Sequence, residues 1–598
     1  MNDSNSHDQP PAPARRTRFF SGGKWRPALV YVRETLGPGH KVMGPAIIIE
    51  PHQTVVVEHG WQAELTAKNH LMLQRIRKLV RPRAVGTRAD PVMLEVFNNL
   101  FMSIAEQMGV ALQNTAYSVN IKERLDFSCA VFDAGGSLVA NAPHMPVHLG
   151  SMDRAVETII RENDGKIRPG DVYAINAPYN GGTHLPDITI CTPVFARRKI
   201  LFWVASRGHH ADVGGISPGS MSPNATTIEQ EGIYIDNFKL VDRGRFREKD
   251  IYALLTSGKY PARNPVQNVN DLKAQIAANE KGAQELRKMV RHFTLRVVRA
   301  YMRHVQDNAA ESVRRVIDRL HDSAFSVEMD QGTVIKVRIT VDKKKRKATV
   351  DFTGTSPQQP NNFNAPEPVT RAAVLYVFRV MVDDDIPMNA GCLRPICIII
   401  PKKSLLSPEF PAAVVAGNVE TSQEVTNCLF GALGAMAAAQ GTMNNLNFGN
   451  ARYQYYETIC SGSPAGPGFP GTDAVHTHMT NTRLTDPEIL EFRYPVLLED
   501  FHIRKDSGGR GRWNAGDGIV RAIRFLEKME CTILSGHRRV RPFGLAGGGD
   551  GQVGENRVRR KDGRLEKLKG CDATVLEARE AIIIQSPTAG GYGNPDSS

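Results

Sequence analysis

Two polar clusters lie in glycine-rich turns of this chain, Gly181-Gly-Thr-His-Leu-Pro-Asp187 and Gly208-His-His-Ala-Asp-Val-Gly-Gly215. Each turn follows an apolar run that is typical of a β-strand. Imidazole and carboxylate side chains therefore gather where strands end. A divalent metal that keeps an open coordination position needs ligands of these two kinds.

If the two turns face each other, His184 and Asp187 form a three-point metal site with either His209 or His210. Water or substrate would take the remaining positions. The alternative is that these side chains satisfy local backbone donors, as short polar residues commonly do in turns. The residues alone leave both interpretations open, and they do not choose between the two neighbouring histidines.

The length of the chain predicts several folding units, because 598 residues are too many for one hydrophobic core. With 41% hydrophobic and 23% charged residues, the composition is that of an ordinary globular protein. Helical and strand-like patterns follow one another along the chain. They predict a multi-domain α+β fold, with a helix-bearing core and β-rich N- and C-terminal parts.

The excess of basic residues is spread along the chain. Lysine and arginine number 75 against 62 acidic residues, which gives a formal net charge of +13. The one dense run, Lys343-Lys-Lys-Arg-Lys347, lies between residues 333–341 and 348–352, where apolar and polar residues alternate. This pattern predicts a β-hairpin with a solvated basic tip. Nucleic-acid binding is disfavoured, because no aromatic residue interleaves with the charges.

Cysteine usage and hydropathy indicate the compartment. The eight cysteines include no C-x-x-C pair, a pattern that predicts reduced and mostly buried thiols in a cytoplasmic protein. No apolar run approaches the length of a membrane span, and the N-terminus lacks the apolar segment of a secretory signal. We therefore expect a soluble protein that does not contact a membrane.

The N-terminal part divides into three segments. Residues 1–18 are polar and proline-rich, which predicts a disordered tail. Residues 19–75 have the alternation and turn signals of a β-rich segment. Residues 76–89 form a basic stretch that we interpret as a linker. The strands expected in the second segment are 28–32, 46–49, 54–57 and 62–65.

The remaining region, 90–593, begins with a strong helix signal. Asp90 is a favourable N-cap and Pro91 suits the first helical position. Residues 271–320 are charged and amphipathic, which predicts long helices, and one more helix is expected near 421–439. The expected metal-bearing part spans about 120–235, and a β-rich C-terminal part spans about 333–593. Strands are expected at 127–132, 172–175, 188–194 and 200–205.

Other polar groups carry weaker signals. His144 and His148 have helical spacing, but Pro146 lies between them and predicts a loop there. The amide-rich run at 361–364 and the pair His476 and His478 suit either a site or ordinary turns. Glycine-rich segments at 508–511 and 547–551 offer backbone amides to an anion but match no phosphate-loop or dinucleotide motif.

Several motifs, in order, resemble the N-methylhydantoinase B family over about residues 90–593. This family includes the hydrolytic half of ATP-dependent oxoprolinase and the large subunits of acetone and acetophenone carboxylases. The motifs that carry the resemblance are Lys122-Glu-Arg-Leu-Asp-Phe-Ser128, Val147-His-Leu-Gly-Ser-Met152, Asn176-Ala-Pro-Tyr-Asn-Gly-Gly-Thr-His184-Leu-Pro-Asp187, Arg207-Gly-His-His-Ala-Asp-Val-Gly-Gly215, Asp351-Phe-Thr-Gly-Thr-Ser356, Val419-Glu-Thr-Ser-Gln423 and His476-Thr-His-Met-Thr-Asn481.

The N-terminal segment 19–75 resembles a different protein, the end of a hydantoinase A-type subunit. The motif is Gly44-Pro-Ala-Ile-Ile-Ile-Glu50, followed by Thr54-Val-Val-Val57. The resemblance implies an A-type partner in a hetero-oligomer, or a fusion of A and B parts of which this chain holds a piece. The actin-like nucleotide-binding domain of the A part has no counterpart here, so ATP and Mg are expected to act only through that partner.

The resemblance also implies a reaction and its residues. The A part would phosphorylate a small cyclic amide, and the B part would open the ring with a metal-bound water. The family pattern places the metal on His184, Asp187 and His209, with Mn, Fe or Zn all acceptable. Asp212 and His210 would orient groups or act as general base. Substrate contacts are assigned to His148, Asn180 and Thr183.

Two alternatives to this hydrolase remain. One is the B-type subunit of an ATP-dependent carboxylase of the acetone or acetophenone type. The other is a non-catalytic, truncated remnant that keeps only the fold. The intact residues His184, Asp187 and His209 favour an enzyme over a remnant.

Overall fold

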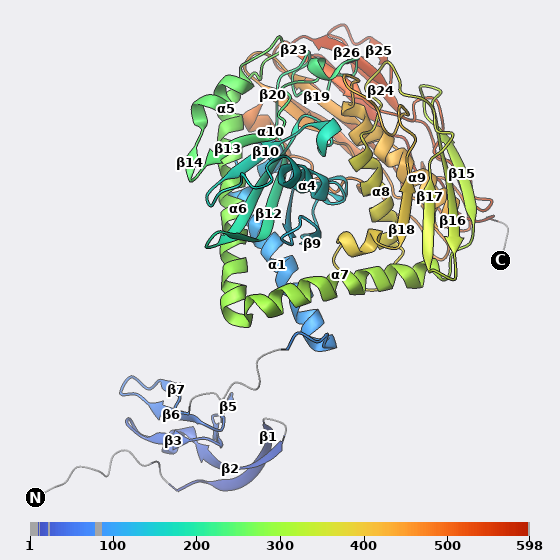
Figure 1. Ribbon diagram of the computed structural model, residues 1–598. Coiled ribbons are helices and arrows are strands. Elements are labelled where there is room, and N and C mark those ends of the chain that lie inside the picture. Colours follow the sequence, from blue (N-terminus) through green and yellow to red (C-terminus); the bar gives the residue numbers. More distant parts are fainter. Residues whose placement is uncertain (1–9, 11, 22–23, 78–85, 596–598) are drawn as a thin grey trace, which may run out of the picture. The chain divides into compact units, whose positions relative to one another are not determined.

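A computed structural model describes residues 10, 12–21, 24–77 and 86–595. The chain divides into two compact units, Met1–Gly86 and Thr87–Ser598, and each is described by itself (Figure 1). Most of the expected tail, and residues 78–85 of the expected linker, lie outside the described residues. One part of the tail prediction is wrong. Residues 15–18 belong to a strand, because their backbone pairs with residues 27–30.

The first unit is all β, in agreement with the β-rich segment expected there. A four-stranded sheet has the order β1-β2-β4-β5 and a three-stranded sheet the order β3-β6-β7. Alternate residues such as Val42, Ile48 and Val57 form its small core. All four expected strands are present. The strands are β1 (Arg15–Ser21), β2 (Lys24–Val32), β3 (Lys41–Met43), β4 (Ala46–Ile49), β5 (Thr54–Val57), β6 (Trp61–Leu65) and β7 (Leu71–Arg75).

The second unit is built around an antiparallel seven-stranded sheet, of order β14-β13-β10-β11-β12-β8-β9. Its central strands are buried along nearly their whole length, and β11 and β12 form its longest hairpin. The four strands expected between 127 and 205 are all confirmed. The strands are β8 (Phe127–Phe132), β9 (Leu138–Asn141), β10 (Val172–Ile175), β11 (Asp187–Ala196), β12 (Lys199–His209), β13 (Phe238–Asp242) and β14 (Arg245–Phe246).

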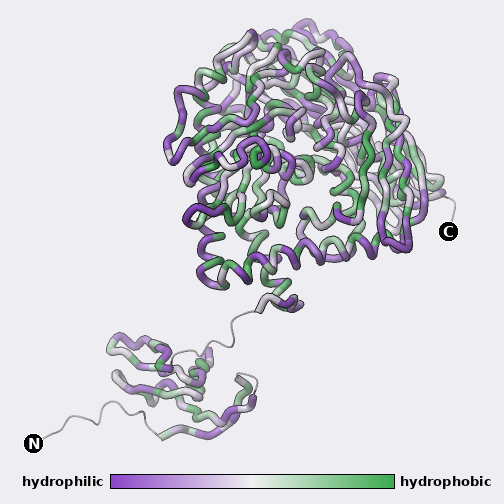
Figure 2. The backbone as a smooth tube through the Cα atoms, viewed as in Figure 1, coloured by the Kyte–Doolittle hydropathy of each residue, from purple (hydrophilic) through white to green (hydrophobic). Residues whose placement is uncertain are grey.

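Long helices cover this sheet. Helix α1 begins as predicted, with the Asp90 side chain accepting a hydrogen bond from the Met93 amide at 2.9 Å. Helices α6 and α7 meet at a corner (Figure 1), where Thr294 has a φ of 72° and separates them. In Figure 2, α7 alternates between hydrophilic and hydrophobic colours, as expected of a half-buried helix. The helices of this part are α1 (Pro91–Thr115), α2 (Val119–Lys122), α3 (Pro146–Leu149), α4 (Met152–Glu162), α5 (Glu248–Leu255), α6 (Pro265–Phe293) and α7 (Leu295–Ile317).

The C-terminal part adds three sheets, of orders β15-β16-β17-β18, β20-β19-β23-β26 and β21-β22-β27-β24-β25. The hairpin expected around the basic run is β16 and β17. These strands are β15 (Ser323–Glu328), β16 (Val334–Asp342), β17 (Lys347–Asp351), β18 (Ile396–Ile399), β19 (Asn445–Gly449), β20 (Gln454–Glu457), β21 (Val496–Ile503), β22 (Ile519–Phe525), β23 (Met529–Leu534), β24 (Glu555–Arg559), β25 (Leu565–Leu568), β26 (Cys571–Leu576) and β27 (Ala581–Gln585).

Three further helices lie among these sheets: α8 (Glu367–Val380), α9 (Ser422–Leu433) and α10 (Pro487–Arg493). The predicted helix at 421–439 extends too far at its C-terminal end. It stops at Leu433 because Gly434 takes the left-handed conformation, which ends many helices. A π-helical turn, Gly417–Thr421, precedes α9. The whole is a multi-domain α+β fold, as the sequence predicted.

Two further sequence predictions concern cysteines and membranes. All eight cysteines are free, and six of them are buried, as predicted. Within the described residues, no helix combines the length and the apolar character that a bilayer crossing needs.

A buried ion pair predicts how stability responds to pH. His537 Nε2 lies 2.6 Å from Glu424 Oε1, and Glu424 is on α9. Burial alone lowers the pKa of His537, but the Glu424 carboxylate outweighs burial and raises that pKa from 6.5 to about 9. The charged histidine therefore stabilises the fold fully below pH 6.5, and this contribution is lost as pH rises through about 9.

We expect the stability lost on Glu424→Gln substitution to be larger at pH 6.5 than above pH 9. Denaturant titrations of both proteins across this range measure the difference. His502→Ala is a control, because its pair with Asp500 is solvent-exposed. A pH-independent difference between the wild type and Glu424→Gln would contradict a charged His537.

Candidate metal centre

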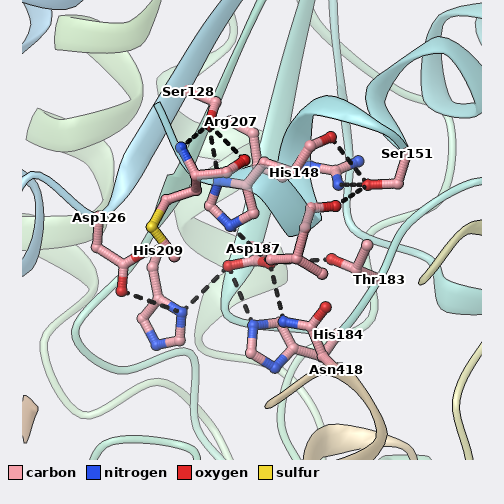
Figure 3. Close-up of polar contacts among 12 residues, drawn as sticks. Asp126, Ser128, His148, Ser151, Thr183, His184, Asp187, Arg207, His209 and Asn418 are labelled. Carbon is pink, nitrogen blue, oxygen red and sulfur yellow. Dashed lines mark hydrogen bonds and ion pairs between the residues drawn. The ribbon is translucent and has the colours of Figure 1, made fainter. Parts of the chain in front are cut away.

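The β11–β12 hairpin brings the two glycine-rich turns together. Asp187 is the first residue of β11 and His209 the last of β12, and the two are directly paired in the antiparallel register. His184 precedes β11 by one short turn, in which the Asp187 amide donates to the His184 carbonyl oxygen at 3.1 Å. Figure 3 shows the imidazoles of His184 and His209 beside the Asp187 carboxylate. All three residues therefore lie at the open end of the hairpin, the first two where β11 begins and the third where β12 ends.

Both oxygens of Asp187 are surrounded by polar groups. Oδ1 lies 3.0 Å from His184 Nε2 and 3.1 Å from His209 Nδ1. Oδ2 lies 3.1 Å from His148 Nε2 and accepts a hydrogen bond from the Thr183 hydroxyl at 2.9 Å. None of these side chains reaches solvent, since His184, Asp187 and His209 are at most 2% exposed. The carboxylate is therefore the hub of an enclosed polar cluster.

The electrostatics keep Asp187 and His209 in the forms that bind cations. Burial by itself raises the pKa of Asp187, but the facing imidazoles of His184 and His148 hold it well below 3.8. Burial lowers the pKa of His209, an effect that the Asp126 and Asp187 carboxylates only partly offset. A deprotonated carboxylate and a neutral imidazole are the forms in which these side chains ligate metals.

The nitrogen atoms of the cluster leave room for a cation. Although His184 Nε2 is close to Asp187, neither ring nitrogen of His184 has a hydrogen-bond partner among the residues that the structure describes, and His209 Nε2 has none there either. Buried nitrogens without partners are uncommon in proteins, and a bound ion or water is one explanation for them. One ligand atom each from His184, Asp187 and His209 lie within 4.8 Å of one another. Two imidazoles and one carboxylate fit a divalent transition metal.

Residues from distant parts of the chain line the other side of His209. Tyr456 of β20 stacks on its ring, with centroids 4.6 Å apart and an interplanar angle of 20°. Asp126 Oδ2 lies 4.0 Å from His209 Nδ1, and the Arg124 guanidinium lies over the Tyr456 ring, 4.7 Å from its centroid. Sequence reasoning missed Tyr456. Asp126 stood inside the quoted motif at 122–128 but received no role.

The π-helical turn before α9 contributes one further residue. Asn418 Nδ2 lies 3.5 Å from Asp187 Oδ2, across 231 residues of sequence, and its own Oδ1 has no partner. Insertions of this kind into helices occur often at functional sites. The motif at 419–423 marked this region, but nothing in the sequence singled out Asn418.

Three residues assigned from sequence lie away from the cluster. His210 hydrogen-bonds Asn268 and Gln275 of α6, each at 3.1 Å. Asp212 pairs with Arg263 at 2.9 Å and accepts the backbone amides of Gly214, Gly219 and Arg263. These contacts make both residues local structural supports, because their polar atoms already have partners.

Asn180 is also removed from Asp187. Its side chain hydrogen-bonds Arg161 at 2.7 Å, Glu162 at 2.6 Å and Asp236 at 2.9 Å. It lines a separate cavity of about 330 Å³ next to α4. Of the three residues assigned to substrate, only His148 and Thr183 contact Asp187, and both do so through Oδ2.

The loop expected around Pro146 is wrong. Residues Pro146–Leu149 form the short helix α3, with the proline at its first position, where the missing amide hydrogen costs nothing. This turn directs His148 toward Asp187. His144 points elsewhere and accepts the backbone amide of Cys129 at 3.0 Å. The pair therefore does not share a ligand, despite its helical spacing.

The remaining polar signals have structural explanations or stay open. Asn362 and Asn364 donate to backbone carbonyl groups, as turn formers do. The two glycine-rich segments pack against each other and the chain end, since a Cβ on Gly509 or Gly548 would meet the Gly591 backbone within 2.5 Å. His476 has no partner for either ring nitrogen.

Comparison with known proteins gives the family. The sequence model described as hydantoinase B/oxoprolinase matches residues 90–595, and the one described as hydantoinase/oxoprolinase C-terminal domain matches residues 1–76. The 5-oxoprolinase 1 of Arabidopsis thaliana is 46% identical over 600 residues, covering 96% of this chain and 47% of that protein. The 5-oxoprolinase of Dictyostelium discoideum is 43% identical over 612 residues, covering 100% and 47%.

The chain thus spans about half the length of these curated relatives. Among solved structures, the ATP-dependent caprolactamase from Pseudomonas jessenii superimposes with a TM-score of 0.77 at 25% identity, covering 85% of this chain and 92% of that one. Sequence matches over nearly the whole of this chain and a shared fold agree. This chain belongs to the hydantoinase B/oxoprolinase family.

Proposed function

We propose that this chain is the ring-opening part of an ATP-dependent cyclic-amide hydrolase of the 5-oxoprolinase type. The observation that carries the proposal is the enclosed cluster of His184, Asp187 and His209, whose unpartnered nitrogens suit a divalent metal. The names of the relatives that match over this chain's length supply the substrate class. An intact cluster also favours an enzyme over a non-catalytic remnant.

The chemistry explains why two activities are needed. Amide resonance makes the carbonyl carbon of a lactam a weak electrophile and its nitrogen a poor leaving group. Phosphorylation of the oxygen removes this resonance, and ATP is the phosphoryl donor. The nucleotide site belongs to an A-type part, on the same polypeptide or on a separate one. Residues 1–76 match the C-terminal domain of that part.

The chain's own residues prepare the centre for water addition. His184, Asp187 and His209 would hold the metal, and Mn, Fe and Zn all accept this set. A divalent metal bound there lowers the pKa of a coordinated water toward neutrality and polarises the substrate. His148 and Thr183 hold Asp187 Oδ2 and so fix the carboxylate plane.

Proton transfer is assigned to Asp126 in place of His210 and Asp212. Apart from Asp187 itself, Asp126 is a carboxylate near His209 Nδ1, at 4.0 Å, whereas the Asp212 carboxylate is bound to Arg263. Tyr456 and the enclosing backbone exclude bulk water from this side of His209. Exclusion of water protects a phosphorylated ring from reaction elsewhere and strengthens the electrostatic contacts inside.

A coupled assay tests the proposal. We expect 5-oxoproline to be opened, with release of phosphate, only when this chain, ATP and an A-type part are all present. His209→Ala should abolish ring opening, because it removes one of the three ligands. The control is His502→Ala, which should leave the rate unchanged. His502 is exposed and pairs with Asp500, not with the residues around Asp187.

Two outcomes would contradict the proposal. Ring opening by this chain alone without ATP would show that phosphorylation is not the activating step. A normal rate for the His209→Ala variant would show that the cluster is not the catalytic centre.

A further inference from the structure

A second cavity, here called the basic–aromatic cavity, lies on the second unit outside the metal centre. Its volume is about 480 Å³. Three cations and four aromatic side chains dominate its wall, and none of its lining residues is acidic: Lys122, Arg452, Arg493, Tyr117, Tyr453, Phe492 and Tyr494. A wall of this composition favours a ligand that carries negative charge and a flat apolar surface.

The cations of this cavity have unused hydrogen-bonding capacity. Among the described residues, neither the Lys122 ammonium nor the Arg452 guanidinium has a hydrogen-bond or ion-pair partner. Arg452 instead lies over the Tyr453 ring, at 4.9 Å from its centroid. Arg493 makes only long contacts, 3.4 Å to the Tyr117 carbonyl oxygen and 3.7 Å to Glu123. All three side chains can therefore donate hydrogen bonds to a bound anion.

The aromatic residues are unusually open to solvent. Phe492 is 88% exposed and Tyr117 is 61% exposed, although both line a cavity. Large apolar side chains that stand in water at the rim of a concave site commonly mark a binding surface. Their flat faces suit stacking on a planar ring.

Two segments run from this cavity to residues beside His209, and a third runs to His210, the neighbour of His209 in the chain. Strand β20 begins in the wall at Gln454 and carries Tyr456, which stacks on His209. Lys122 lies four positions before Asp126. The first turn of α6 lines the cavity through Gln267, and its next residue, Asn268, hydrogen-bonds His210. The cavity and the centre are thus connected through short segments of the same strand, helix and loop.

We propose that the basic–aromatic cavity binds a small planar organic phosphate. The cations would bind the phosphate oxygens, and Tyr117 and Phe492 would stack on the ring. An oxygen-phosphorylated cyclic amide is a compound of this class, so the inference deepens the proposed function. The identity of the natural ligand rests on that proposed function. The cavity would hold that compound before it reaches the enclosed centre.

Binding is measured by calorimetry on the full chain, with phenyl phosphate as the probe. We expect one saturable site for phenyl phosphate and at least tenfold weaker binding of both inorganic phosphate and phenol, since each supplies only half of the recognised features. Arg452→Ala should weaken binding at least tenfold, and Arg452→Lys should restore part of it. Phe492→Ala should weaken the binding of phenyl phosphate but leave the affinity for inorganic phosphate unchanged.

A matched control uses Arg315→Ala, an exposed arginine on α7 that does not line the cavity. It should bind phenyl phosphate like the wild type, and all variants should retain the wild-type metal content because they lie outside the cluster at Asp187. Absence of saturable binding, or equal affinities for the wild type and Arg452→Ala, would overturn the proposal.

The measurement separates this inference from the proposed function. It needs neither ATP, nor an A-type part, nor turnover. If no ring opening is found but phenyl phosphate binds with the expected variant pattern, the hydrolase proposal fails and the cavity assignment stands. If rings are opened but phenyl phosphate does not bind, the cavity assignment alone fails.

Discussion

Replacing Asp187 with alanine is expected to abolish metal binding by this chain while leaving the protein folded. Asp187 is the only member of the cluster that contacts both His184 and His209, through Oδ1 at 3.0 and 3.1 Å. Its removal takes away the negative charge of the site and the group that orients both imidazoles. The loss of affinity should exceed the roughly 10–100-fold that follows removal of an outer-shell partner.

The measurement is the metal content of purified protein, followed by titration with Mn and Zn. Thr183→Val provides the graded comparison. It removes one hydrogen bond to Asp187 Oδ2 and keeps all three ligands. Its affinity should fall by only about 10–100-fold. Equal metal content in the wild type and Asp187→Ala would contradict the assignment of a metal site to this cluster, whatever the activity of the variant.

Replacing Glu457 with glutamine is expected to destabilise the second unit by about 3–5 kcal/mol. Glu457 of β20 forms a two-pronged pair with Arg521 of β22, at 2.7 and 3.0 Å, and both side chains are at most 1% exposed. The pair connects two sheets of the C-terminal part. Glutamine has nearly the same shape but no charge, so the Arg521 cation would stay buried without its counter-ion.

Denaturant unfolding of the full chain, followed by near-ultraviolet circular dichroism, measures this effect. The control is Glu577→Gln, which removes the exposed pair with Lys528 at 3.0 Å. Exposed pairs contribute below about 1 kcal/mol, so this variant should unfold close to the wild type. Similar unfolding midpoints for Glu457→Gln and Glu577→Gln would show that Arg521 finds solvent or another partner in the variant.

Elements with local signals could be predicted from sequence. The start of α1 at Pro91 followed from the cap residue Asp90, and β8 and β10 followed from short apolar runs between turn residues. Errors occurred where a local rule has two outcomes. Proline excludes the interior of a helix but suits its first position, and at Pro146 the second outcome holds. The end of α9 was placed too late because the left-handed Gly434 received no weight.

In the candidate centre too, local features could be predicted from sequence and contacts between distant elements could not. The sequence placed His184 and Asp187 together because they lie three positions apart in one turn. It left His209 and His210 as alternatives, since adjacent residues of a strand point to opposite faces. The choice depends on α6, which lies against β12 and supplies Asn268 and Gln275 to His210. His209 is left facing Asp187.

Residue order alone determined the strands, the capped helices and the short-range pairing of imidazole with carboxylate, because backbone preferences and turn hydrogen bonds act over a few residues. Tertiary structure decided which polar atoms share an enclosed space. Tyr456 and Asn418 reach the centre from more than 200 positions away, and Arg263 takes Asp212 out of it. These outcomes depend on how buried faces pack. Packing brings together residues that are far apart in the chain, and no local sequence pattern indicates such contacts.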